Sequence, residues 1–329
     1  MNRCLSTLAE LDEEGFSPGA LDRLSDRRKF PTRLDFTRSD IAAISAETME
    51  HISISGVQQK LSLRLERGEL KPTGEGGQYI LKPVPETSLP RLQEDVPANE
   101  HLTMQIARQV YDIETAANAC IRLKDGELAY ITRRFDRTSD DERIAQEDFC
   151  QLMGRTEETH GKQFKYDASY ETLGQALRSY CGAYLIEAEK LFCRIVFNYA
   201  VANGDAHLKN VSLTETTFGD YVLTPAYDLM CTKLHLPNES RLALDLFDGD
   251  ERPASFQTHG FVTGADLIEL ARRFGLDEKR ATSILDDLCG KRDEVDSLVE
   301  RSFLSEGAKQ TYREILQDRL RALEIRTTS

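Results

Sequence analysis

The first third of the chain shows two kinds of apolar periodicity. Residues 61–66 (LSLRLE) alternate apolar and polar side chains, the period of a half-buried strand, and residues 78–84 (QYILKPV) are a second strand candidate. The apolar period then changes to four, at Leu102, Ile106 and Val110, which predicts an amphipathic helix. These patterns predict two strands followed by a helix.

A hairpin is predicted next, over residues 120–135, with Asp125 and Gly126 at its turn. The polar, mixed residues 1–50 indicate short helical pieces at best. Residues 1–135 are therefore expected to form a small lobe of strands with one helix. This lobe also contains a serine-rich loop.

Helical patterns dominate after a charged, loop-like stretch that begins at residue 138. Residues 184–202 are apolar nearly all round, which is typical of a central buried helix. Residues 211–224 predict a short hairpin, and Thr263 can cap a further helix. The fold class expected is α+β, with a second, larger helical lobe over residues 136–329 and the joint near residues 133–145.

Composition and charge narrow the class of protein. The 329 residues are 40% apolar and 30% charged, an ordinary globular balance, and the net charge of −14 argues against direct nucleic acid binding and against adhesion to anionic membranes. No run of about 18 apolar residues predicts a membrane span, and the N-terminus lacks the apolar stretch of a secretory signal. Seven cysteines without a C-x-x-C pair indicate reduced thiols in the cytoplasm.

The stretch NGDAHLKN, residues 203–210, directly follows the predicted buried helix and carries the most informative spacing. In kinases, an Asp lies near the acceptor hydroxyl and an Asn five positions later binds magnesium, which is the spacing of Asp205 and Asn210. Asp228 follows the predicted hairpin, where kinases place a second magnesium ligand. Magnesium prefers hard oxygen ligands, which Asn210 and Asp228 supply.

The small lobe contains matching candidates in the same chain order. The loop from Ser53 to Gly56 precedes a strand and could cover phosphates, Lys82 lies in the next strand, and Glu100 lies in the first turn of the helix. A strand Lys paired with a helix Glu is the phosphate clamp of kinase folds.

Each candidate also has an ordinary structural interpretation. Asp228 could be a turn or helix cap, Lys82 a surface lysine, and Glu100 a partner of the helix dipole. His207 could contact the triphosphate or merely brace its loop. It is their combined order along the chain that favours phosphoryl transfer.

Seven motifs resemble the HipA family of serine/threonine-protein kinase toxins from bacterial toxin–antitoxin modules. They are SISGVQQKLSL (53–63), YILKP (79–83), NEH (99–101), RRFDR (133–137), QEDFCQLMG (146–154), NGDAHLKN (203–210) and LTPAYDLM (223–230). The resemblance implies a two-lobed, protein-kinase-like fold that uses ATP and Mg²⁺.

The resemblance also assigns roles to residues. It makes Asp205 the catalytic residue, Lys82 a phosphate contact and Glu100 its clamp partner, with Asn210 and Asp228 as metal ligands. The nucleotide-binding residues that it implies are Ser55, Gly56, Val57, Gln58, Gln59 and Lys60 in the loop, Lys82 in its strand, Arg133, Arg134 and Phe135 at the hinge, and His207, Leu208, Lys209, Asn210, Tyr227 and Asp228 in the large lobe.

Regulation and partners follow from the same resemblance. Family members phosphorylate a serine of their own loop, which here suggests Ser53 and Ser55. Because the loop begins near residue 53, the chain resembles the short HipT form, for which a separate HipS-like protein and a DNA-binding HipB-like antitoxin are the expected partners. Family targets include aminoacyl-tRNA synthetases, and the tryptophanyl enzyme is associated with the short form.

Two alternatives remain open from the residues. A small-molecule phosphotransferase of the aminoglycoside or choline kinase type has a similar G-D-x-H-x-x-N loop, which residues 204–210 fit. An inactive kinase-like module that acts only as a repressor partner is the second alternative, although the expected catalytic residues are all present.

Overall fold

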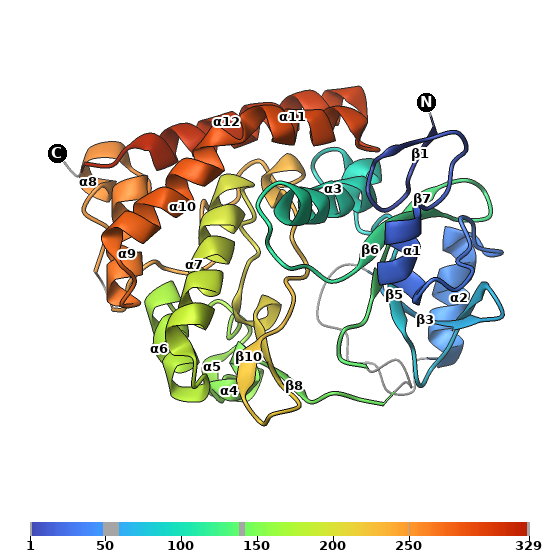
Figure 1. The fold of residues 1–329 in the computed structure, drawn as a ribbon, viewed down its shortest axis with the longest axis horizontal. Coiled ribbons are helices and arrows are strands. Elements are labelled where there is room, and N and C mark those ends of the chain that lie inside the picture. The colour runs from blue at the N-terminus through green and yellow to red at the C-terminus, as the bar shows by residue number, and fades with distance from the viewer. Residues whose placement is uncertain (1, 49–58, 138–141, 250, 328–329) are drawn as a thin grey trace.

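The computed structural model describes residues 2–48, 59–137, 142–249 and 251–327. A part built on a curled β-sheet lies beside a larger helical part (Figure 1). Both are expected from the sequence. The architecture is that of a two-lobed, kinase-like α+β fold.

The larger sheet is antiparallel, with strand order β4-β3-β5-β7-β6. Its strands are β3 (Leu61–Glu66), β4 (Glu69–Pro72), β5 (Tyr79–Lys82), β6 (Asn118–Arg122) and β7 (Leu128–Arg133). The predicted strands and the hairpin are confirmed, and Gly126 takes φ +95° at the turn, a conformation that glycine adopts without steric cost. At the end of β5, Lys82 lies opposite Tyr130 of β7.

The predicted amphipathic helix is α3 (Val96–Gln109), which follows the short 3-10 helix η1 (Gln93–Asp95) and has a proline in its first turn. Helix α3 contacts β6 and β7 on one side and helix α11 on another, so it lies between the sheet and the helices (Figure 1). Almost all of it is buried, including the polar side chains of Asn99, Glu100 and His101. A polar group in such a place needs a partner, because burial without one is costly.

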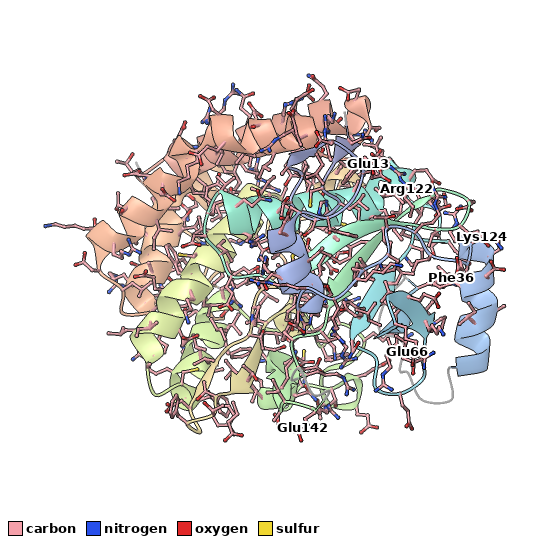
Figure 2. The ribbon with its side chains drawn as sticks, turned by 45° about the vertical axis from the view of Figure 1, so that its right-hand side comes forward. Glu13, Phe36, Glu66, Arg122, Lys124 and Glu142 are labelled. Atoms are coloured by element: carbon pink, nitrogen blue, oxygen red, sulfur yellow. The ribbon has the colours of Figure 1, made fainter. Side chains whose placement is uncertain are left out.

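The N-terminal residues contribute to the core of the sheet, a role their polar composition did not predict. They form β1 (Asn2–Arg3), β2 (Glu10–Leu11), α1 (Pro18–Ser25) and α2 (Arg38–Thr48). The side chains of Leu24, Phe30, Leu34, Phe36 and Ile41 are buried in one cluster with the strands. Phe36 lies beside the β6–β7 turn, where its carbonyl oxygen accepts from the Lys124 amide at 3.0 Å (Figure 2). The short helical pieces expected here are present, and α1 and α2 are additional to the single helix expected in residues 1–135.

The helical part is arranged around α7. Its elements are α4 (Phe149–Leu152), α5 (Glu157–His160), α6 (Tyr170–Tyr180), α7 (Tyr184–Ala200), α8 (Phe256–His259), α9 (Gly264–Arg273), α10 (Glu278–Gly290), α11 (Arg292–Arg301) and α12 (Glu306–Glu324), with 3-10 helices η2 (Leu208–Asn210) and η3 (Thr232–Leu234). Helix α7 contacts α6, α10 and α12, which confirms the predicted central helix. Its first turn departs from the pattern, because Leu185 and Ile186 are exposed there.

A small sheet accompanies these helices, with strand order β10-β9-β8. The predicted hairpin supplies β9 (Ser212–Glu215) and β10 (Tyr221–Leu223), and β8 (Gln146–Asp148) adds a third strand that was not predicted. All seven cysteines are free, and five of them are buried. Across the described residues, none of the helices combines the length and apolar character needed to cross a membrane.

Helix α9 offers a test of the packing in the helical part. Thr263 caps it as predicted, in a capping box with Asp266. The next residue, Gly264, packs against the end of α12. A β-carbon at Gly264 would overlap the carbonyl oxygen of Leu323. We expect Gly264→Ala to lower the free energy of unfolding by about 1–3 kcal/mol, because an overpacked backbone contact must be displaced.

Urea unfolding would measure this loss. The matched control is Gly290→Ala, because nothing lies within 4 Å of a β-carbon at Gly290. Equal stability of the two variants would contradict the assigned contact between α9 and α12.

Candidate active site

The segment 203–210 is held in a fixed shape after α7. Ala202 takes φ +52°, which reverses the chain at the end of the helix. The side chain of Asn203 then donates back to Asn198 Oδ1 at 2.9 Å, and the amide of Gly204 donates to Thr232 Oγ1 at 2.8 Å. The loop is therefore tied both to α7 and to η3.

Asp205 and Asn210 are brought together within this loop. The carbonyl oxygen of Asp205 accepts from Asn210 Nδ2 at 2.9 Å and from the amide of His207 at 2.8 Å. Both bonds go to the backbone oxygen of Asp205, and its carboxylate takes part in neither of them. The Asp205 side chain is 47% exposed, so an acceptor group from solvent can reach it.

Lys82, Glu100 and Asp228 meet from three different elements. The Lys82 ammonium lies 2.6 Å from Glu100 Oε1 and 2.5 Å from Asp228 Oδ1. The side chains of Lys82 and Glu100 are almost fully buried, 5% and 3% exposed. The strand Lys and helix Glu predicted from sequence thus form a direct ion pair, and they share it with the Asp that follows the hairpin.

Charge in this triad is set by burial and by the neighbours. Burial alone would lower the pKa of Lys82, but the carboxylates of Asp228 and Glu100 outweigh it and raise that pKa. Burial opposes ionisation of Asp228 as well, yet the ammonium groups of Lys82 and Lys60 hold its pKa well below the usual range. Burial raises the pKa of Glu100. Lys82 therefore stays protonated and Asp228 stays ionised at neutral pH.

Asp228 has the properties of a metal-binding position. It takes φ +53°, a strained region for a residue other than glycine, and strain of this kind gathers at functional sites. Its side chain is 31% exposed, and its Oδ2 lies 3.9 Å from the ammonium of Lys60. No group of three His, Cys, Asp or Glu side chains suited to a metal occurs within the described ranges. Magnesium fits such a site, because proteins commonly bind it through one or two oxygen ligands completed by substrate phosphates.

His207 is a buried, neutral imidazole beside the loop Asp. It is 6% exposed, and burial lowers its pKa to about 4. Its Nε2 lies 3.7 Å from Asp205 Oδ1, and its Nδ1 has no hydrogen-bond partner in the described part of the chain. At neutral pH the ring therefore adds no positive charge.

The other residues expected in the large lobe stabilise the loop. Leu208 is fully buried in the core. The hydroxyl of Tyr227 donates to the carbonyl oxygen of Lys209 at 2.9 Å and lies 2.5 Å from Ser212 Oγ. The Lys209 ammonium lies 3.3 Å from Asp148 Oδ2. These contacts hold the loop against β8 and β9.

The structure directs the side chains of the expected hinge residues away from the triad. The Arg133 guanidinium donates to both carboxylate oxygens of Asp26 at 2.8 and 2.7 Å, and that of Arg134 binds Asp136. The amides of Arg133 and Arg134 donate to Ala117 and Gln78. The ring of Phe135 instead packs against the ring of Tyr227, the residue that precedes Asp228, with the two centroids 5.6 Å apart.

Some residues expected in the site lie outside the described residues, and some residues that were not expected lie close to Asp205. Ser53, Ser55, Gly56, Val57 and Gln58 belong to the first group, whereas Gln59 and Lys60 are described and lie directly before β3. Three residues near Asp205 were not expected: Lys165, Tyr166 and Glu239. No motif or periodicity marks them in the sequence, because their proximity arises only from folding.

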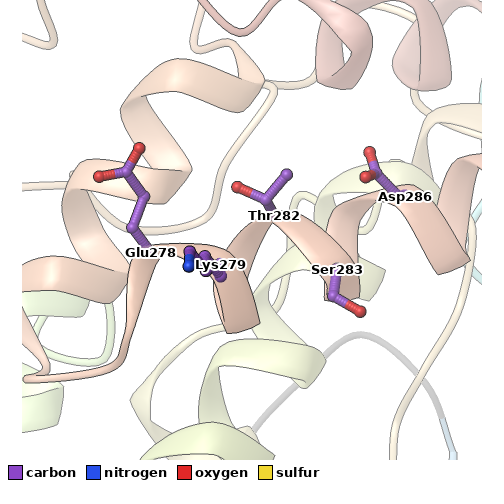
Figure 3. Close-up of a pocket in the computed structure, with 5 residues that line it drawn as sticks. All are labelled: Glu278, Lys279, Thr282, Ser283 and Asp286. Atoms are coloured by element: carbon purple, nitrogen blue, oxygen red, sulfur yellow. The ribbon is translucent and has the colours of Figure 1, made fainter.

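Surface hollows elsewhere are of a different character. One of about 320 Å³ is lined by Glu278, Lys279, Thr282, Ser283 and Asp286 (Figure 3). All five belong to one helix, α10, so no second element contributes a converging group. Another lies around α9 and contains none of the expected site residues.

Comparisons with known proteins place the chain in a family. A family model described as HipA-like C-terminal domain matches residues 52–295. Relatives named with the words "putative kinase" include one from Haemophilus influenzae, 27% identical over 323 residues that cover 92% of each chain. A second, Y4dM from Sinorhizobium fredii, is 30% identical over 70% of this chain and 57% of its own length. This chain therefore spans little more than half of that second relative.

Two solved structures share the fold. HipA of a Shewanella oneidensis toxin–antitoxin system, solved with HipB and operator DNA, has a TM-score of 0.66 at 20% identity over 89% of this chain and 73% of its own. The Helicobacter pylori proinflammatory kinase CtkA has a TM-score of 0.50 at 15% identity over 79% and 90%. Because the family model covers most of the chain, from residue 52 to residue 295 in α11, the protein belongs to the family of the HipA-like C-terminal domain.

Proposed function

We propose that this protein is an ATP-dependent serine/threonine-protein kinase that acts as the toxin of a type II toxin–antitoxin module. The observation that carries the proposal is the buried Lys82, paired at once with Glu100 and Asp228. An ordinary surface lysine would not be held between two carboxylates at 5% exposure. In kinases, the Lys–Glu pair and the metal-binding Asp must both be in place for transfer.

Each residue has a distinct role in the proposed reaction. Lys82 binds nucleotide phosphates, and Asp228 and Asn210 hold Mg²⁺, which neutralises developing charge on the phosphates when it is bound. Asp205 accepts the proton of the acceptor hydroxyl while the hydroxyl oxygen bonds to the γ-phosphorus and ADP departs. Residues 133–135 supply backbone groups to adenine other than the amides of Arg133 and Arg134, which are already bonded, and the loop that contains Ser55 and Lys60 covers the phosphates.

The test is transfer of label from γ-labelled ATP in a bacterial lysate, with Asp205→Asn as the inactive control. Label on a protein band, recovered as phosphoserine or phosphothreonine, supports the proposal. Label on a sugar or another small molecule would favour the aminoglycoside-kinase type of activity instead. Absence of transfer with ATP and Mg²⁺ would favour the inactive repressor module.

Partners and substrate are proposed from the family. The similar Shewanella oneidensis protein was solved with HipB and operator DNA, which supports a HipB-like antitoxin for this chain. We further propose a HipS-like partner, a cytoplasmic location and an aminoacyl-tRNA synthetase, the tryptophanyl enzyme first, as substrate. The lobes proposed are residues 1–135 and 136–329.

Self-phosphorylation at Ser53 or Ser55 is expected to reduce activity. A phosphoserine adds about −1.5 to −2 charges at neutral pH, which would repel the phosphates of ATP. Intact-mass spectra of the wild type and of Asp205→Ala, both made in a host without related kinases, would measure how much phosphate each protein carries. Phosphate on these serines in Asp205→Ala would argue against self-modification.

A further inference from the structure

Tyr166 makes a contact with Asp205 that neither the motifs nor the proposed roles include. It lies in the irregular segment 161–168 after α5, 39 residues before Asp205 in the chain. Its phenol hydroxyl donates to Asp205 Oδ1. Burial, and then this hydrogen bond, raises the pKa of Tyr166, so the phenol keeps its proton and remains a donor.

The segment around Tyr166 is fixed to the loop by separate contacts. The amide of Leu208 donates to the carbonyl oxygen of Lys165 at 3.1 Å. The ring of Tyr166 meets that of His207 edge to face, with centroids 5.1 Å apart. On its other side, the guanidinium of Arg155 lies 3.0 Å from the carboxylate of Asp167. The position of the phenol relative to Asp205 is therefore determined by several bonds at once.

The contacts to the Asp205 carboxylate fall on one oxygen. Tyr166 donates to Oδ1, and the nearest atoms of His207 and Lys165 lie 3.7 and 4.0 Å from that same Oδ1. Oδ2 takes part in none of these three contacts. A carboxylate on a side chain that is 47% exposed would otherwise sample several rotamers, because the hydrogen bonds from Asn210 and the His207 amide go to the backbone oxygen of Asp205 and do not hold its carboxylate.

We propose that Tyr166 is a positioning residue for phosphoryl transfer: its hydroxyl fixes Asp205 through Oδ1 and leaves Oδ2 for the acceptor hydroxyl. The inference rests on the proposed kinase function. During transfer the acceptor proton moves to Oδ2, the acceptor oxygen bonds to the γ-phosphorus, and the bond from that phosphorus to ADP breaks. Tyr166 keeps its proton throughout.

The test is Tyr166→Phe, which removes only the hydroxyl. The initial rate of γ-phosphate transfer from labelled ATP to lysate protein is measured at saturating ATP, with the KM for ATP and the Tm. We expect the rate to fall about 10- to 100-fold, because a slightly misplaced catalytic group costs that much, while the KM for ATP stays within about twofold and the Tm is unchanged. Tyr180→Phe is the matched control. Tyr180 lies at the end of α6, and the variant loses one hydrogen bond, from the phenol hydroxyl to the carbonyl oxygen of Leu152 at 2.8 Å. It should transfer phosphate at the rate of the wild type.

Other outcomes overturn the inference. An unchanged rate would show that Asp205 needs no such support, and a higher rate would show that Tyr166 shields Asp205 from acceptors. A fall in rate matched by an equal loss of ATP affinity or of Tm would show a structural role. If the wild type and Asp205→Asn transfer equally, or if neither transfers, the proposed function itself fails and the inference falls with it.

Discussion

Asp205→Asn is expected to lower the rate of phosphoryl transfer by about 10²–10⁴-fold, the range that a positioned proton acceptor contributes. An asparagine at this position keeps the shape of the side chain and an oxygen for Tyr166, but it cannot take the proton of the acceptor. The loop should remain intact, because Asn210 and His207 bind the backbone oxygen of Asp205 and not its carboxylate. The free energy of unfolding should therefore change by no more than about 0.5 kcal/mol.

Transfer at saturating ATP and urea unfolding would be measured on the same preparation. Asp318→Asn is a suitable control, because it makes the same change of charge on the exposed face of α12, where Asp318 is 57% exposed. A rate within threefold of the wild type would remove Asp205 from catalysis. Loss of rate together with loss of stability would instead mean that the carboxylate supports the fold.

Lys82→Met is expected to abolish transfer and also to destabilise the protein by about 3–5 kcal/mol at neutral pH, the usual effect of breaking a buried ion pair from one side. Methionine fills much of the volume of lysine, so the loss comes mainly from Glu100, which is 3% exposed and would remain without its cation. Asp228 is affected less, since it is 31% exposed and keeps Lys60 nearby.

The destabilisation by Lys82→Met should depend on pH in a defined direction. Burial raises the pKa of Glu100 above its ordinary value of 4.5, and removal of Lys82 can only raise it further. A carboxyl with a raised pKa favours the folded state while it is protonated, and that contribution is lost as the pH rises through the folded-state pKa. The difference in stability from the wild type should therefore shrink as the pH falls from about 8 toward about 5.

A second substitution separates the two effects of Lys82. Lys82→Met combined with Glu100→Gln removes both buried charges, so unfolding in urea should recover most of the lost stability. Phosphoryl transfer should stay absent, because the phosphate contact is still missing. Recovery of activity in the double variant would show that the pair has no part in binding nucleotide. A pH-independent loss of stability in the single variant would show that the charge of Glu100 is not the source of that loss.

Elements with a clear apolar period were predictable from sequence, and those held by distant pairing were not. The alternation in residues 61–66 and the period of four in α3 appear directly in the structure. By contrast, β8 is the polar tripeptide QED, and it becomes a strand only because β9 pairs with it. Leu24, Phe30 and Phe36 follow no period, and they are buried by contact with strands far along the chain.

The residues of the candidate site were also predictable from sequence only in part. The order along the chain predicted that Lys82, Glu100 and Asp228 meet, and the structure brings these three together. That Asp205 belongs to the same site stays a prediction. What the order could not reveal was the surroundings of each group. That Asp26 binds the side chain of Arg133, or that Tyr166 reaches Asp205, follows from contacts across 107 and 39 residues, for which no local pattern exists.

The family model that matches this protein covers less of the chain than the unit that folds. The family model spans residues 52–295, whereas Leu24 and Phe30 before it and Tyr312 and Leu320 after it are buried in the two cores. A fragment cut at the family limits would expose apolar surface on both lobes and should aggregate. Substitutions in the flanking segments can therefore disable the protein without touching any recognisable motif.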